Sequence, residues 1–236
     1  MRATPLAIGA ALSAAFAANA AFAGITIDGT LRIVYMDDIG TNPYKEGPDT
    51  GTYVDTVSGT SGAGNSSIHG EATQNTNIQP LKFSGSGSAR LNAKLPAVGG
   101  PHNESIFRVT FTITTPYAWV TKGTVSQTTH GGTGQAIARL THDDSGSDVL
   151  LANADVNLGT TNVDFSGSGI LMPGTYYFAT LAWTDQGRGG DDPPHTADVL
   201  ASFNNVSLTL SAVPEPASLS LLALGAGGLM LRRRAR

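Results

Sequence analysis

Apolar and polar side chains alternate with a period of two along much of the chain. From Phe107 to Thr114, Phe, Val and Ile alternate with Arg and Thr, which predicts a half-buried strand with a threonine-rich face. Residues 174–183 are dense in β-forming side chains and follow a Pro173-Gly174 turn, so they predict another strand. Shorter runs of the same kind predict strands at 119–125, 136–140, 149–152 and 199–210.

The strand expected at 174–183 has two faces, and only one of them can be exposed. One face carries Tyr176 and Phe178, and the other carries Tyr177, Leu181 and Trp183. Because successive side chains of a strand point to opposite faces, the core takes one of these sets and solvent the other. The sequence leaves both assignments open.

Turn signals and the lack of helical spacing predict the fold class. Asp28-Gly29 separates the apolar runs 25–27 and 31–35, which predicts a tight hairpin. No window before the last 24 residues carries an apolar stripe with helical spacing. About eight strands joined by glycine-rich turns predict an all-β body, a β-sandwich of the jelly-roll type.

The segment 37–77 breaks this rhythm, since Gly, Thr, Asn, Ser and Asp dominate it. Such a polar composition cannot build a core of its own, and a loop of this length is unusual in a compact domain. We therefore interpret 37–77 as a long polar insertion with at most one short edge strand. The alternative places Thr52–Val57 inside the sheet.

The first 23 residues predict a secretory signal peptide. Arg2 precedes an uncharged, alanine-rich run that starts at Leu6, and Ala21 and Ala23 are the small residues of a cleavage site before Gly24. Export would leave a mature body that begins at Gly24 and extends to residue 212.

The last 24 residues (213–236) form a second targeting signal. Pro214, Glu215 and Pro216 precede an uncharged stretch, 219–231, and four arginines close the chain: Arg232, Arg233, Arg234 and Arg236. As a helix the stretch spans roughly 20 Å at 1.5 Å per residue, or roughly 22 Å if it starts at Ala217, which is short of the ~30 Å hydrocarbon core of a bilayer. The arginines would hold this end in the cytoplasm by the positive-inside rule.

Proline, acid, proline, a short apolar helix and an arginine cluster, in this order, resemble the PEP-CTERM sorting signal of Gram-negative bacteria. The resemblance implies that an exosortase, a membrane processing enzyme, recognises Pro214, Glu215 and Pro216. It also implies a transient transmembrane helix at 219–231, stopped by the arginines. The expected destination is then the cell surface or an extracellular biofilm matrix that contains exopolysaccharide. The alternative is an ordinary membrane anchor that is never cut.

Charge and cysteine content narrow the function classes. Residues 24–212 carry nine Lys and Arg against 17 Asp and Glu, a net charge of about −8, although the whole chain has only −4. An acidic body would repel nucleic acid and anionic lipid. The chain has no cysteine, which excludes disulfides, thiolate metal sites and a cysteine nucleophile.

The sequence gives only weak evidence for hydrolytic catalysis or metal binding. The five histidines lie in no catalytic signature and no Gly-x-Ser-x-Gly elbow occurs, so we expect no enzyme activity and assign no catalytic residue. His142–Asp148 and the acidic residues at 185–192 could supply oxygen ligands to calcium, but neither has the spacing of a twelve-residue calcium loop. Solvated turns are the preferred interpretation, and we expect no metal or other cofactor.

Aromatic side chains provide the remaining candidate, a glycan contact. Sugars stack on exposed aromatic rings beside amides and carboxylates, and Trp119 and Trp183 lie in the only aromatic clusters dense enough for this. Core packing is the competing interpretation for each ring. Phe203–Ser207 also looks like the closing strand of sugar-binding jelly rolls, over a very short stretch.

Together these features predict an exported, exosortase-processed protein with a non-catalytic body that binds polysaccharide or supports aggregation. Two alternatives are a secreted hydrolase of matrix polymers and a structural matrix component without a specific ligand. Carboxylates and histidines that converge in a concave pocket would favour the hydrolase. A flat aromatic platform would favour binding.

Overall fold

The computed structural model of the chain describes residues 24–37, 43–63, 66–94, 102–143, 145–155, 159–185 and 196–213. They form the strands β1 (Ile25–Met36), β2 (Tyr44–Glu46), β3 (Gly51–Ala63), β4 (Ser66–Gln79), β5 (Lys82–Lys94), β6 (His102–Ile113), β7 (Tyr117–His130), β8 (Thr133–His142), β9 (Ser147–Ala154), β10 (Gly159–Leu171), β11 (Gly174–Asp185) and β12 (Ala197–Ala212). None of the described residues belongs to a helix of the length and apolarity that crossing a bilayer requires. The signal peptide and sorting signal expected from the sequence lie outside the described residues, with Ala21, Ala23, Pro214, Glu215, Pro216, Arg232, Arg233, Arg234 and Arg236.

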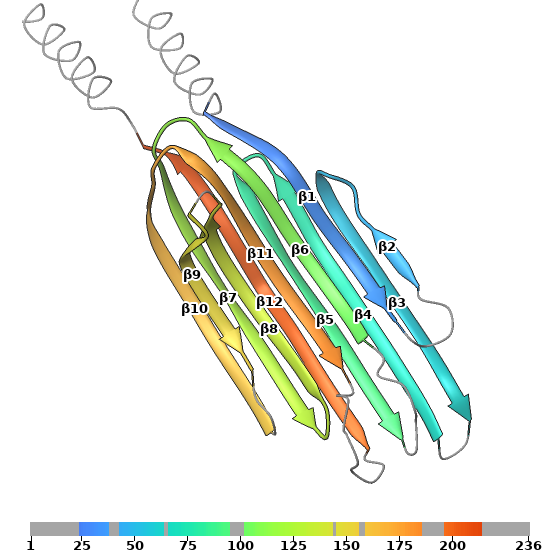
Figure 1. The fold of residues 1–236 in the computed structure, drawn as a ribbon. Coiled ribbons are helices and arrows are strands. Elements are labelled where there is room, and N and C mark those ends of the chain that lie inside the picture. The colour runs from blue at the N-terminus through green and yellow to red at the C-terminus, as the bar shows by residue number, and fades with distance from the viewer. Residues whose placement is uncertain are drawn as a thin grey trace, which may run out of the picture.

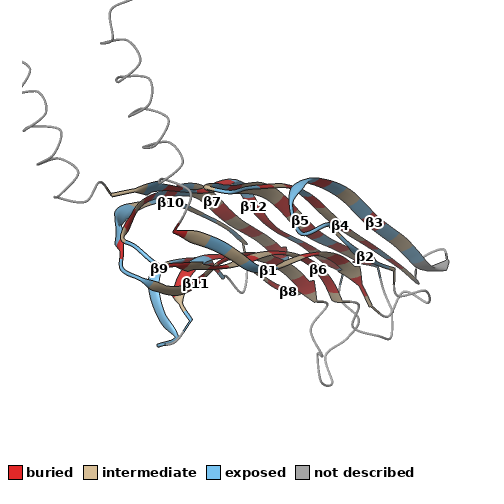
Figure 2. Cartoon of the chain, turned by 90° about the horizontal axis from the view of Figure 1, so that it is seen from above, coloured by how far each residue is buried: buried red, intermediate tan, exposed pale blue. Residues whose placement is uncertain are grey.

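The strands form two antiparallel six-stranded sheets that lie one on the other (Figure 2). Sheet A has the order β2-β1-β6-β11-β8-β9, and sheet B has the order β10-β7-β12-β5-β4-β3 (Figure 1). The expected all-β class and the two-sheet arrangement are confirmed. A jelly-roll order stays a prediction.

The core lies between the sheets and follows the alternation seen in the sequence. On β6 every second side chain is fully buried, including Phe107 and Phe111, and the ring of Phe111 meets Phe83 of sheet B at 5.4 Å between centroids. On β11, Tyr176 and Phe178 are buried in the same cluster. The face of β11 that carries Trp183 therefore points away from the core.

The Asp28-Gly29 hairpin expected from the sequence is wrong. β1 continues through this dipeptide and pairs with β6 along its whole length, with a β-bulge between Ile27 and Gly29. Pairing with the long central strand β6 overrides the local turn signal, and the bulge accommodates the extra residue.

The polar insertion expected at 37–77 is also wrong, because β3 and β4 are long strands of sheet B. They pair with each other in continuous register from Gly51 and Ile78 onwards, as the alternative for Thr52–Val57 anticipated in part. Val57, Ile68 and Ala72 turn inward and join a second buried cluster. Ser, Thr and Asn occupy most of the outward positions, together with Val54, His69 and Glu71, and they make the segment polar in composition.

The interior contains one charged side chain of β1, that of Arg32. Arg32 is fully buried, and its three guanidinium nitrogens have no hydrogen-bond partner among the described residues. Burial lowers the pKa of Arg32, although the charge of Asp49 opposes this effect. The nearby phenol of Tyr53 is buried too, and burial raises the pKa of Tyr53 to about 12.

Both ends of the described body meet at one end of the sandwich (Figure 1). The amide of Thr114 donates to the carbonyl of Gly24 at 2.9 Å, and the amide of Val213 donates to the carbonyl of Pro116 at 3.3 Å. The turn between β6 and β7 therefore holds both ends. His102, at the start of β6, lies about 37 Å away at ~3.4 Å per residue.

Candidate functional site

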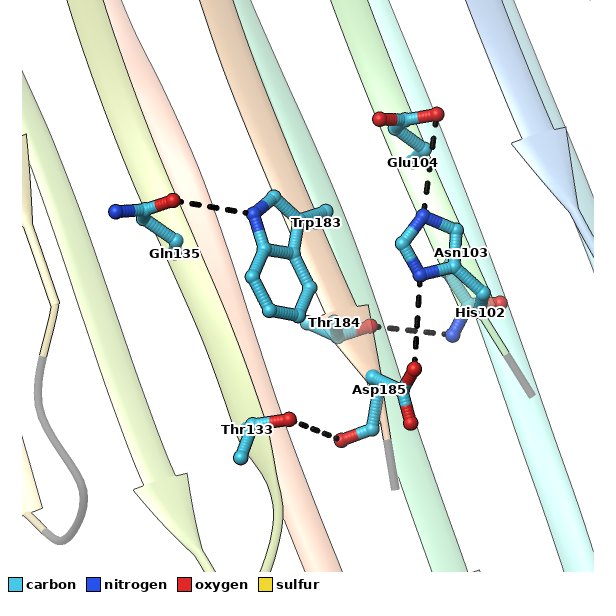
Figure 3. Close-up of polar contacts among 8 residues, drawn as sticks. All are labelled: His102, Asn103, Glu104, Thr133, Gln135, Trp183, Thr184 and Asp185. Atoms are coloured by element: carbon cyan, nitrogen blue, oxygen red, sulfur yellow. Dashed lines mark hydrogen bonds and ion pairs between the residues drawn. The ribbon is translucent and has the colours of Figure 1, made fainter. Parts of the chain in front are cut away.

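A cluster of polar and aromatic side chains covers the far end of sheet A, on its solvent side (Figure 3). Trp183 on β11 lies at its centre and is half-buried. Its indole Nε1 donates to Oε1 of Gln135 on β8 at 3.3 Å. Nε2 of Gln135 in turn donates to Oδ1 of Asn153 on β9 at 3.0 Å. The indole and the two amides thus form a connected row across three strands. We call this row, together with His102, Glu104 and Asp185, the Trp183 site.

His102 completes the site from β6. Its ring stacks on that of Trp183 with 5.8 Å between centroids and 27° between planes. Its Nε2 lies 3.9 Å from Oε2 of Glu104, and its Nδ1 lies 3.9 Å from Oδ2 of Asp185. Glu104, and to a smaller extent the charges of Asp185 and Asp37, raise the pKa of His102, while burial opposes the rise. The protonated imidazole is therefore favoured between two carboxylates.

The strand register brings these residues together. Asp185 is the direct cross-strand partner of His102, and Trp183 is the partner of Glu104. Beneath them, the buried amide Nδ2 of Asn103 donates to Oγ1 of Thr184 at 3.1 Å and fixes β6 to β11. Because the site lies on paired strands, its geometry is set by the sheet.

The site has the groups that bind a polyhydroxylated ligand. The side chains of His102, Glu104 and Asp185 are 33%, 24% and 32% exposed, so a ligand can reach them. Carboxylates and amide oxygens accept hydrogen bonds from hydroxyls, and the free amide hydrogens donate. Within the described segments, no group of three or more His, Asp or Glu is arranged to hold a metal ion.

The two tryptophans expected as glycan contacts have different places. Trp119 is only 6% exposed and belongs to the core. Glycines at 167 and 169 of β10 lie against it, since an added Cβ on either would come within 2.9 Å of its ring. Trp183 is therefore the accessible one of the pair.

The acidic stretch 142–148 considered for calcium joins β8 to β9, and its Asp144 lies outside the described residues. The amide of Gly146 donates to the carbonyl of His142, and Oγ1 of Thr141 donates to Asp148 at 2.6 Å. The imidazole of His142 packs edge-on against Tyr176, with 4.7 Å between centroids. Asp191 and Asp192 of the other acidic stretch lie outside the described residues.

A second surface feature is a groove of about 220 Å³ on sheet B, lined mainly by hydroxyl and amide side chains of β3, β4, β5 and β12, together with Val54 and the carboxylate of Asp55. Its hydroxyls are bonded to the protein itself: Thr73 and Ser88 share a hydrogen bond of 2.8 Å, and Ser86 accepts from the amide of Asn205. No aromatic ring lines this groove. The Trp183 site is the better candidate because it combines a ring with accessible carboxylates and amides.

The residues that join Trp183 in the site were missed in the sequence. His102 and Asp185 lie 83 positions apart, and only the pairing of β6 with β11 reveals their proximity. The sequence carries no clear signal for them, because the intervening positions Asn103 and Thr184 are polar as well and no apolar period marks which face is exposed.

A known family matches the part of the chain that begins at the end of β12. Residues 212–234 are a PEP-CTERM protein-sorting motif. The PEP-CTERM motif targets an exported protein to an exosortase and anchors it transiently in the membrane, so the resemblance seen in the sequence is confirmed. The motif starts at Ala212, the last residue of β12.

Comparisons with whole proteins add little to the PEP-CTERM match. No curated protein matches the chain. Among solved structures, the enzymatically active domain of bacteriophage CBA120 tailspike protein 4 is similar over 66% of this chain and 19% of its own, with 16% identity and a TM-score of 0.24. The D431N mutant VP2 protein of infectious bursal disease virus is similar over 80% and 72%, with 14% identity and a TM-score of 0.18. Both TM-scores are too low to bear on function.

Proposed function

We propose that this is a non-catalytic protein of the cell surface or extracellular matrix of a Gram-negative bacterium, whose β-sandwich binds polysaccharide at the Trp183 site. One observation carries the proposal: a partly exposed indole lies beside the amides of Gln135 and Asn153 and the carboxylates of Glu104 and Asp185. An indole gives an apolar surface for the C–H face of a sugar and keeps a polar edge. The neighbouring groups can bond its hydroxyls.

The position of the site fits a protein that is first held at a membrane. Gly24 and Val213 lie at one end of the sandwich and His102 at the other. While the sorting signal anchors the chain, the Trp183 site would project into the extracytoplasmic space. A polymer could then bind before and after exosortase processing.

A binding screen tests the proposal. The full-length chain, in a non-ionic detergent, is titrated with a panel of neutral and charged polysaccharides. We expect saturable binding that Trp183→Ala weakens at least tenfold, since the indole supplies most of the apolar contact. Val120→Ala is the control, because Val120 is 57% exposed on β7 of the opposite sheet. Equal binding by wild type and Trp183→Ala would overturn the proposed site.

A secreted hydrolase is the second candidate, because Glu104 and Asp185 lie on either side of His102. Carboxylate pairs perform general acid–base chemistry on glycosidic bonds. Size-exclusion chromatography of each polymer after incubation distinguishes the two functions. Shortening by the wild type but not by Glu104→Gln would favour the hydrolase, and unchanged polymer length with retained binding would favour the lectin-like function.

A further inference from the structure

Two arginines flank one tyrosine on the solvent side of sheet A. Tyr177 lies on β11, six residues before Trp183 and on the same face. The Cζ atom of Arg108 on β6 is 4.4 Å from the centroid of the Tyr177 ring, and the Cζ atom of Arg139 on β8 is 5.0 Å from it. Because β6 and β8 pair with opposite edges of β11, the arginines approach the ring from its two sides.

The two guanidinium groups have no carboxylate partner among the described residues. The ion pairs found there use Lys45, Arg90 and His102 instead. Nε of Arg108 is buried and also lacks a hydrogen-bond partner in the described part of the chain. In a body with 17 acidic and nine basic side chains, two adjacent arginines without a carboxylate are unexpected.

Stacking on tyrosine orients these groups for a ligand. A guanidinium that lies over an aromatic face keeps its in-plane N–H donors free, and these donors match a carboxylate or sulfate in geometry and charge. Ala179 is the direct cross-strand neighbour of both Arg108 and Arg139, while the ring of Tyr177 lies between their guanidinium groups. Each guanidinium can therefore meet an anionic group of the same polymer on its own side of the ring.

We propose that Arg108, Tyr177 and Arg139 form an anion-binding subsite for the carboxylate or sulfate groups of an acidic polysaccharide. This inference rests on the proposed glycan-binding function and specifies its ligand. Ala179 and Trp183 are four residues apart on β11, about 13 Å at ~3.3 Å per residue. One polymer chain that lies along β11 therefore contacts the ring of Trp183 and places a charged group at the arginines.

The experiment compares three polymers on the full-length chain in non-ionic detergent: a polyuronate (alginate), a sulfated polymer (dextran sulfate) and neutral dextran. We expect the acidic polymers to bind at least tenfold more tightly than dextran, and this preference to fall as salt rises. Arg108→Gln and Arg139→Gln should each reduce the affinity for the acidic polymers about tenfold, the effect of one charge-assisted hydrogen bond. Comparison of the two acidic polymers identifies the preferred anion.

The matched control is Arg90→Gln, which removes one positive charge from the opposite sheet, where Arg90 pairs with Asp198 at 3.8 Å. Unchanged acidic-polymer affinity in this variant, with a loss in the other two, supports the subsite. Equal losses in all three variants indicate a general charge effect and overturn it. If the wild type binds all polymers equally and only Trp183→Ala weakens binding, the anion subsite fails while the proposed function stands. If no polymer binds, the proposed function fails.

Discussion

The imidazole of His102 stacks on the indole of Trp183, with 5.8 Å between ring centroids. This contact joins the titratable group of the site to its aromatic surface. Protonated His102 places a cation against the indole, an arrangement that the ring quadrupole stabilises. The two carboxylates on either side of His102 add to this preference.

The first prediction concerns the pKa of His102. Because Glu104 is the largest cause of its raised pKa, Glu104→Gln should lower the pKa of His102 toward its ordinary value. A titration of the imidazole by NMR measures the change. Glu71→Gln, a carboxylate on sheet B, should leave it unaltered. Equal shifts in both variants would mean that total charge, and not the contact, sets this pKa.

The same raised pKa has a consequence for stability. A group whose pKa is higher in the folded state stabilises the fold below its unfolded pKa and loses this contribution as pH rises through its folded pKa. We therefore expect His102→Gln to destabilise the protein more at pH 5 than at pH 8, as measured by urea denaturation. A destabilisation that does not depend on pH would contradict this linkage.

The second prediction concerns the glycines over Trp119. A methyl group added at Gly167 would lie 2.8 Å from Leu150 and 2.9 Å from the Trp119 ring. Gly167→Ala should therefore reduce the free energy of unfolding by about 1–3 kcal/mol through overpacking. The control is Gly29→Ala, because nothing lies within 4 Å of that position. Equal loss of stability in both variants would contradict the packing argument.

The third prediction concerns the charge of Arg32. The buried guanidinium of Arg32 has no hydrogen-bond partner among the described residues, so only the more distant charge of Asp49 offsets its desolvation energy. Arg32→Met keeps a long, adaptable side chain and should raise the free energy of unfolding by about 1–3 kcal/mol. Arg90→Met, at an exposed position, should change it by less than about 0.5 kcal/mol. A destabilised Arg32→Met protein would show that the charge has a partner in solution.

The fourth prediction concerns export. Glu215 is the only formal charge between Asp198 and Arg232, and we expect the four final arginines to stop the chain at the membrane. Glu215→Gln, or removal of residues 232–236, should leave the precursor in the membrane fraction of cells that contain the exosortase. Normal release of either variant, judged by cell fractionation, would argue against the sorting function of these residues.

The sequence was sufficient to predict those strands in which apolar and polar side chains alternate strongly. Phe107 and Phe111 alternate with Arg and Thr, and both are buried as expected. It was insufficient for β3 and β4, where the inward positions include polar Gln74 and Thr76 and small Ala72, so the apolar period is weak. The Trp183 site could not be assembled, because its residues come from four strands whose order depends on long-range pairing.

The attachment of the tail to β12 has a mechanical consequence. β12 is an inner strand of sheet B, paired with β5 on one side and β7 on the other, and its last residue, Ala212, is also the first residue of the PEP-CTERM motif. Its ladder bonds lie across the strand direction, so a pull along the tail loads them together in shear instead of opening them one at a time. If a bound polymer pulls on the far end of the body, the ladder hydrogen bonds of β12 would therefore resist the force together before either sheet separates.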